Sequence, residues 1–219
     1  MAHSPTCGRS TEPSGAGDSH GQMARNVLEA PTMTTKFDEV AAPAWSIRPE
    51  QPLDLDLIHD LHREAFGRPD EAELVDAIRS GPDFIPELSL VAAAADGSIL
   101  GHVLVSRIAF EEDAFAVRGD VLTLAPLAVL PPHGGRGIAS ALTAQVLAEV
   151  DKRAEPFVFV LGSPSFYARF GFAAASSFGI ESPYTAAGAA FQVRPRPNGP
   201  APVAGTVFYP RMFEQLRAR

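Results

Sequence analysis

The chain has 219 residues, a formal net charge of −8, 46% apolar residues and 20% charged residues. This balance is typical of a soluble globular domain, and the negative charge argues against non-specific binding of nucleic acid. The single cysteine, Cys7, excludes an intramolecular disulfide framework and a cysteine-based zinc site, and it fits a reducing, cytoplasmic compartment. We expect no membrane partner, because the sequence has neither an apolar run of about 20 residues nor the layout of a secretory signal.

Residues 1–42 differ in composition from the rest of the chain. They are rich in Ser, Thr, Gly, Pro and Ala and contain few large apolar side chains. Such a segment cannot bury enough apolar surface to offset the entropy cost of ordering it. The composition therefore predicts a disordered N-terminal tail of residues 1–42 and one folded domain of residues 43–219.

From Trp45 onward, strand-like and helix-like patterns alternate. The predicted strands cover residues 45–48, 88–95, 99–110, 121–130 and 157–161. The predicted helices cover residues 53–66, 70–80, 138–150 and 164–170. Residues 172–209 are expected to be rich in strands and loops, and residues 208–216 to form a terminal strand and helix. This order predicts an α/β fold, of the α+β type, with a mixed sheet and helices on both faces.

A glycine-rich turn lies between a predicted strand and the helix that begins at Ile138. Gly134, Gly135 and Gly137 let the backbone bend tightly and bring its N–H groups close to a ligand. The helix N-terminus adds unpaired donors and the positive end of the helix dipole, and Arg136 adds a fixed charge. These groups suit a pyrophosphate, although an ordinary strand-to-helix loop explains the same residues equally well.

Two other phosphate-binding motifs fit this turn less well. A P-loop has Lys and then Ser or Thr after its last glycine, where this chain has Ile138 and Ala139. A dinucleotide-binding fingerprint requires a different glycine spacing after the first strand of its domain. The turn therefore predicts neither motif.

The turn resembles the pyrophosphate signature of the GCN5-related N-acetyltransferase (GNAT) family, and in particular its bacterial YhbS-like group. That signature reads Arg/Gln-x-x-Gly-x-Gly/Ala, and this chain matches it at Gly137 and Ala139. Its first position falls on Gly134, where the family usually has a side chain. Because the signature works mainly through backbone N–H groups, we expect binding to survive this departure and its affinity, or the shape of the turn, to change.

A second block, residues 158–172, looks like the strand, short helix and Tyr-x-x-x-Gly-Phe ending found in these enzymes. Here the ending is formed by Tyr167, Gly171 and Phe172. The two blocks have the order and separation that the family shows, and the element order from Trp45 to the C-terminus also fits. The resemblance therefore implies a GNAT-type fold, in which two central strands splay apart.

The resemblance implies an N-acyltransferase that moves an acetyl group from acetyl-CoA to a primary amine by direct attack. Strand backbone would pair with the pantetheine arm of acetyl-CoA, and the glycine-rich turn would hold its pyrophosphate. The cofactor-binding residues implied in this way are Leu127, Ala128, Val129, Gly134, Gly135, Arg136, Gly137, Ile138, Ala139 and Ser140. No His, Asp or Glu spacing in the sequence predicts a metal site.

The resemblance also implies catalytic roles. Tyr167 stands where related enzymes have the general acid, and a phenol with a pKa of about 10 can protonate a leaving thiolate; an aromatic ring that merely packs its short helix is the alternative. An N–H group at Val129 would polarise the thioester carbonyl. Glu111, in the acidic stretch 111–119, is a candidate general base, although a solvated acidic loop is the commoner role for such a stretch.

The histidines give weaker signals. His59 and His62 fall on a predicted amphipathic helix, where surface positions are expected. His102 lies in a predicted strand and is expected to be a packed core residue. His133 precedes the glycine-rich turn, where it serves either as a cofactor contact or as a plain loop residue.

A protein that binds CoA without turnover, as a sensor or interaction module, is the alternative function. The Gly134 departure and the unplaced base keep this alternative open, and an unrelated α/β domain that binds another anion is a third. The acceptor, a small molecule or a protein, has no readable signature, although the acidic composition slightly favours a cationic one. Homodimers are common among related proteins, so a homodimer is compatible with the resemblance.

Overall fold

The computed structural model describes residues 44–114 and 117–213. The predicted tail of residues 1–42 and the last part of the predicted terminal helix lie outside the described residues.

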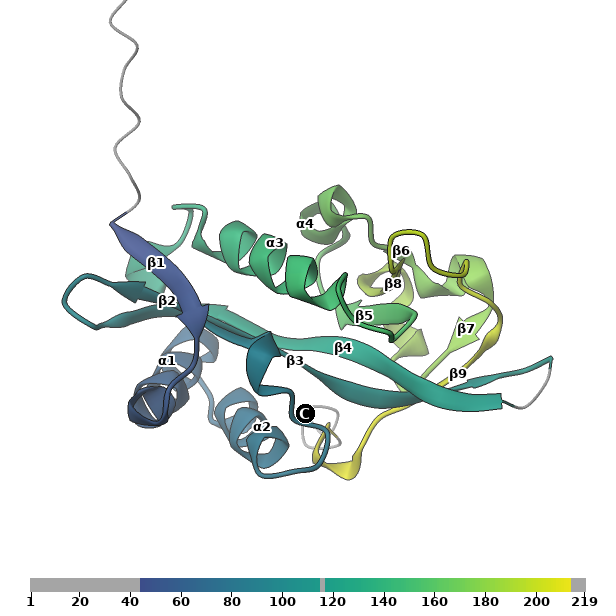
Figure 1. Ribbon diagram of the computed structural model, residues 1–219, viewed down its shortest axis with the longest axis horizontal. Helices are drawn as coiled ribbons and strands as arrows, with labels where there is room; N and C mark the ends of the chain where they lie inside the picture. The colour runs from purple at the N-terminus through teal and green to yellow at the C-terminus, as the bar shows by residue number, and fades with distance from the viewer. Residues whose placement is uncertain (1–43, 115–116, 214–219) are drawn as a thin grey trace, which may run out of the picture. The chain divides into compact units, whose positions relative to one another are not determined.

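Nine strands form one mixed sheet in the described part of the chain (Figure 1). Their order is β1-β2-β3-β4-β5-β8-β6, and β9 pairs with the far end of β3 and with β7. Neighbouring strands are antiparallel except for the pairs β4–β5 and β7–β9. The bounds are β1 Trp45–Pro49, β2 Ser89–Ala94, β3 Ile99–Glu112, β4 Val117–Val129, β5 Phe157–Leu161, β6 Ala173–Ala174, β7 Ile180–Glu181, β8 Phe191–Pro195 and β9 Gly205–Phe208.

Helices cover both faces of the sheet, as the sequence predicts. The helices are α1 Leu55–Phe66, α2 Asp70–Arg79, α3 Ile138–Val150 and α4 Pro164–Tyr167. In Figure 1, α1 and α2 lie on one face and α3 and α4 on the other. Each face has its own apolar cluster, one with Ile58 and Leu74 from α1 and α2, the other with Leu142 and Val146 from α3. The sheet therefore alternates its apolar side chains between two buried faces.

The β3–β4 hairpin is longer than its sequence predicts. Residues 111–119 were expected to form an acidic connection, but Glu111 and Glu112 continue β3, and 117–119 begin β4. The extension pairs β3 with β9 over Ala109–Glu112. Backbone hydrogen bonds from two neighbouring strands explain why acidic residues of low β propensity take an extended form here.

Helix α3 packs tightly against β3 at Gly101. A Cβ atom at this glycine would lie 2.9 Å from Cγ2 of Ile138 and 3.0 Å from Cδ1 of Leu142. Because no larger residue fits without a shift, Gly101 lets the first turns of α3 rest directly on β3. This contact helps to fix where the N-terminus of α3 lies relative to β4.

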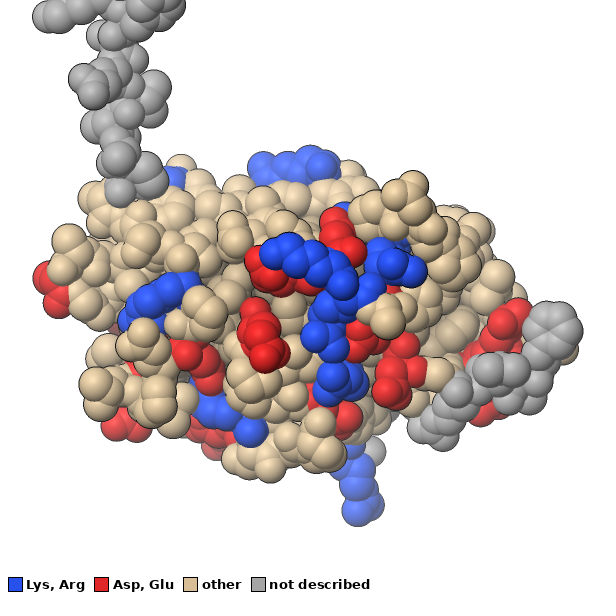
Figure 2. Space-filling model, viewed as in Figure 1, with Lys and Arg blue, Asp and Glu red and all other residues tan. Residues whose placement is uncertain are grey.

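Charges of both signs are mixed on the face shown in Figure 2, where Lys and Arg side chains lie among Asp and Glu side chains. Ion pairs within the described residues include those of Arg153 with Glu155, Lys152 with Glu149 and Arg194 with Asp151. The negative net charge of the chain is therefore not matched by a separate acidic patch on this face.

Candidate functional site

Strands β4 and β5 diverge halfway along β4. Their parallel pairing joins Leu122–Leu124 to Val158–Val160 and ends there, whereas β4 continues to Val129 beside β3. Two local features accompany the divergence: the register between β3 and β4 shifts between Val103 and Val105, and Pro126 has no N–H group to give to a neighbouring strand. The central strands are therefore splayed, as the family resemblance implies.

A cavity of about 260 Å³ lies where the strands diverge. Its walls come from segments far apart in the sequence. They include β4 (Thr123–Leu127), the end of β5 (Leu161), α4 (Tyr167), the corner between α1 and α2 (Phe66, Arg68 and Glu71) and the C-terminal part of the chain (Tyr184, Tyr209 and Phe213). The fold thus brings a strand gap, a phenol and a charged pair to one site.

Tyr167 is held in this cavity by close packing. Its ring makes edge-to-face contacts with Phe166 and Phe172, at centroid distances of 4.8 and 5.4 Å. Gly162, just after β5, leaves the space that the ring fills, since a Cβ atom there would overlap the ring of Tyr167. Burial raises the pKa of the Tyr167 phenol to about 12. The side chain is therefore a fixed, protonated hydroxyl group at neutral pH.

The glycine-rich turn requires glycine at two of its positions. Gly135 and Gly137 have φ angles of +73° and +83°, in the left-handed region that residues with a side chain rarely adopt. Gly134 has φ −58°, which any residue can adopt. The backbone at Gly134, the first position of the signature, therefore has a conformation that does not require glycine.

The turn also leaves a row of backbone donors unpaired. The hydrogen bond from Ala141 N–H to Gly137 C=O, 3.0 Å long, begins the helical pattern. Within the described residues, the N–H groups of 135–140 have no backbone acceptor. Unpaired donors at the positive end of a 13-residue helix form an anion-binding geometry.

Arg169 is a neighbour of this turn that the sequence analysis missed. Its Nη2 donates a hydrogen bond of 2.9 Å to Oγ of Ser140, in the first turn of α3. Its guanidinium carbon lies 4.4 Å from the ring centre of Phe166 and 5.0 Å from that of Phe170. Arg169 lies inside the Tyr-x-x-x-Gly-Phe block, but only the folded chain shows that this block reaches α3.

The other predicted site residues lie in different places. Leu127 lines the cavity, and Ala128 and Val129 follow it on β4, where Val129 pairs with Gly101 of β3. The side chain of Arg136 lies in a separate hollow with Trp45 and His133. Glu111 lies on the extended part of β3 and does not line the cavity. Tyr167 and β4 therefore line the same cavity, whereas Glu111 lies outside it.

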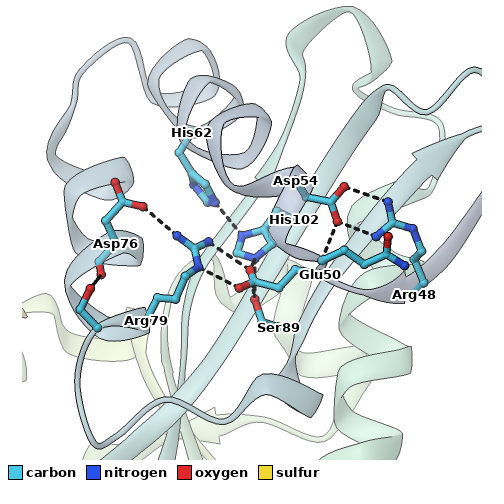
Figure 3. A network of polar contacts seen from close by, with 10 residues as sticks. Arg48, Glu50, Asp54, His62, Asp76, Arg79, Ser89 and His102 are labelled. Carbon is cyan, nitrogen blue, oxygen red and sulfur yellow. Dashed lines mark hydrogen bonds and ion pairs between the residues drawn. The ribbon is translucent and has the colours of Figure 1, made fainter.

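A buried polar network that links α1 and α2 to β2 and β3 includes two of the histidines (Figure 3). Nε2 of His62 and Nδ1 of His102 are 2.8 Å apart, and Nε2 of His102 is 2.9 Å from Oγ of Ser89. Oγ of Ser89 in turn donates to Glu50, which also accepts two hydrogen bonds from Arg79. The prediction for His102 as a core residue is confirmed, but the prediction of a surface position for His62 is wrong.

The position of His62 has a physical reason. Its exposed fraction is 0%, because it faces the sheet from α1 and its ring stacks on that of Phe66 at 6.0 Å. A helical pattern alone cannot show that a histidine on the inner face will find a polar partner such as His102 on the strand below. Burial, followed by the charges of His102, Arg79 and His59, lowers the pKa of His62 to about 2.

A mixed sheet with splayed parallel strands, helices on both faces and a glycine-rich turn before α3 defines the acyl-CoA N-acyltransferase class of folds. The chain belongs to the GNAT family of N-acetyltransferases, since residues 46–175 match the family described as acetyltransferase (GNAT) domain.

Two relatives and two solved structures support this membership. The chain is 33% identical to the Uncharacterized N-acetyltransferase YhbS of Escherichia coli strain K12 over 147 residues, 67% of this chain and 84% of YhbS. It is also 33% identical to YjhQ of the same strain over 128 residues, 58% of this chain and 69% of YjhQ. A structure of E. coli YhbS in complex with CoA has a TM-score of 0.68 and 30% identity and covers 79% of this chain and 93% of that chain. The structure of a GNAT acetyltransferase of Brucella melitensis in complex with acetyl-CoA has a TM-score of 0.63 and 29% identity. It covers 77% of this chain and 97% of that chain.

Within residues 44–114 and 117–213, no group of three or more His, Cys, Asp and Glu side chains could hold a metal ion. In the same part of the chain, no helix has both the length and the apolar character needed to cross a membrane.

Proposed function

We propose that this protein transfers an acetyl group from acetyl-CoA to a primary amine by direct attack of the amine on the thioester. The observation that carries the proposal is the divergence of β4 from β5 beyond Leu124, with a cavity at the divergence that Tyr167 lines. The two solved relatives in complex with CoA and acetyl-CoA support the choice of donor. A cytoplasmic location fits this donor and remains an expectation.

The turn before α3 has the properties that a pyrophosphate needs. Its N–H groups at 135–140 have no backbone acceptor in the described part of the chain, and the helix dipole favours an anion at that point. Arg169, bonded to Ser140, adds a positive charge at the same helix end. We infer that Arg169 supplies part of the attraction that a side chain at Gly134 would otherwise give.

The gap between β4 and β5 would bind the thioester arm, and the phenol of Tyr167 would protonate the leaving group. Acetyl-CoA supplies an activated acyl group and a thiol leaving group. The edge of β4 at Leu127–Val129, unpaired with β5, would bind the pantetheine amides as an added strand does, and the N–H of Val129 would polarise the thioester carbonyl. Tyr167 stays protonated at neutral pH, because burial raises its pKa to about 12, and can therefore give its proton to the leaving sulfur.

The base that removes the amine proton has less support. Glu111, the candidate from the sequence, lies outside the cavity on the extended part of β3. Glu111 would therefore act through ordered water, and a Glu111→Gln variant with unchanged turnover would remove the residue from the mechanism.

The proposal is tested by measuring acetyl-CoA binding and amine-dependent release of thiol with the full chain. We expect acetyl-CoA to bind, and Tyr167→Phe to lower kcat at least tenfold while leaving the dissociation constant of CoA within about twofold. Tyr184→Phe removes a phenol hydroxyl from another wall of the same cavity and should lower kcat much less. Binding of CoA without thiol release on any amine would instead favour a sensor or interaction module.

A further inference from the structure

One wall of the cavity is aromatic. Phe66 approaches from the end of α1, while Tyr184, Tyr209 and Phe213 approach from the C-terminal part of the chain. The ring of Tyr209 makes edge-to-face contacts with Tyr184 and Phe213, at centroid distances of 4.9 and 5.0 Å. These contacts fix the rings relative to one another before any ligand enters.

The hydroxyl groups of this wall are used within the protein. The phenol of Tyr184 donates a hydrogen bond of 3.1 Å to the main-chain oxygen of Phe213, and the phenol of Tyr209 lies 3.4 Å from Oγ1 of Thr123. What the wall presents to an occupant is therefore mainly ring surface, which favours an apolar or aromatic body.

Charge in the cavity is limited to one pair in the described part of the chain. Glu71 has the one carboxylate and Arg68 the one guanidinium among the lining residues. Glu71 is 5% exposed and accepts hydrogen bonds from Arg68 on both of its oxygens. Each oxygen can accept a further bond, so the carboxylate can receive one ammonium group. A polycation would need several carboxylates that this cavity lacks.

The volume bounds the part of an acceptor that the cavity can enclose. About 260 Å³ is below the range of about 300–1,000 Å³ that is common for sites of drug-sized ligands. An engineered apolar cavity of about 150 Å³ in another protein takes up a benzene ring. The space therefore suits a ring or branched chain with a short aminoalkyl arm, once the acyl end of the donor occupies the side near β4.

We propose that the acceptor is a small monoamine with an apolar or aromatic body, whose ammonium group binds to Glu71 and whose body packs against Phe66, Tyr184 and Phe213. This inference rests on the proposed acetyl transfer. It agrees with the weak preference for a cationic acceptor that the acidic composition gives, and the single carboxylate among the lining residues narrows that preference to one ammonium group.

The first test compares acceptors. Thiol release from acetyl-CoA is measured with 2-phenylethylamine, isoamylamine, spermidine, kanamycin and a short peptide with one lysine. We expect kcat/KM for the two small monoamines to exceed that for the others at least tenfold. A higher kcat/KM for spermidine, kanamycin or the peptide overturns the acceptor assignment and leaves the acetyl transfer standing. Acetyl-CoA binding with no turnover on any amine overturns both.

The second test compares matched variants. Glu71→Gln should raise KM for 2-phenylethylamine at least tenfold, with kcat and the dissociation constant of CoA changed less than threefold. Glu73→Gln, on the exposed side of the same helix, is the control. Phe66→Ser tests the apolar wall and leaves the Arg68–Glu71 ion pair unchanged. Leu53→Ser, at a position that is 89% exposed, is its control. KM values equal to those of the controls for both cavity variants overturn the assignment.

Discussion

The buried histidine pair predicts how the stability of the fold depends on pH. His62 has a pKa of about 2 in the folded protein, against an ordinary value of 6.5. Between these two pH values the unfolded chain binds more protons than the folded chain, so the free energy of unfolding falls as pH falls below 6.5. His102, whose pKa burial also lowers, changes stability in the same direction.

The size of the effect follows from the shift of His62. At pH 5, which is about 1.5 units below the pKa of the unfolded state, keeping His62 neutral lowers the free energy of unfolding by about 2 kcal/mol relative to pH 8. This value follows from about 1.4 kcal/mol per pH unit. Glu50 does not disturb the measurement in this range. Its pKa is lowered from 4.5 to about 2: burial opposes this change, but the hydrogen bonds from His102, Arg79 and Ser89 outweigh it. Its contribution is therefore lost only below about pH 4.5.

Urea unfolding between pH 5 and 8, followed by the fluorescence of Trp45, tests this prediction. We expect wild-type protein to lose about 2 kcal/mol or more between pH 8 and 5. His62→Gln should remove about 2 kcal/mol of that loss, because its amide can still bond to His102 but does not titrate. His133→Gln, outside the network, is the control. A constant wild-type stability over this range, or equal losses in wild type and His62→Gln, would refute the reasoning.

Three further changes test how the site is positioned. Gly162→Ala should push the ring of Tyr167 aside and lower kcat at least tenfold with little change in CoA affinity, as steady-state kinetics and calorimetry would measure; an unchanged kcat would show that the ring can relax without cost. Arg169→Ala should weaken CoA binding and reduce its salt dependence, whereas Arg153→Ala, paired with Glu155 elsewhere, should do neither. Gly101→Ala should destabilise the fold by about 1–3 kcal/mol through overpacking against α3, measured by urea unfolding, and a smaller loss would mean that α3 shifts freely.

Local patterns in the sequence were sufficient for the main elements. The bounds predicted for α3 and β5 agree with those observed, Ile138–Val150 and Phe157–Leu161. Both segments have regular apolar patterns, and glycine or proline marks the start of α3 and both ends of β5. The two glycines with positive φ before α3 were also readable, because few residues other than glycine adopt that conformation.

The sequence by itself determined the alternation of strands and helices, the glycine-rich turn and the family that these imply. Only the tertiary structure decided what lies around the site. It showed the stop of β4–β5 pairing at Leu124, the Arg169–Ser140 contact and the burial of His62 against His102. Local propensity depends on neighbours along the chain, so a sequence pattern can report it. A cavity wall or a buried polar pair depends on residues that are distant in sequence, such as Glu71, Tyr167 and Tyr209, and folding alone brings them together.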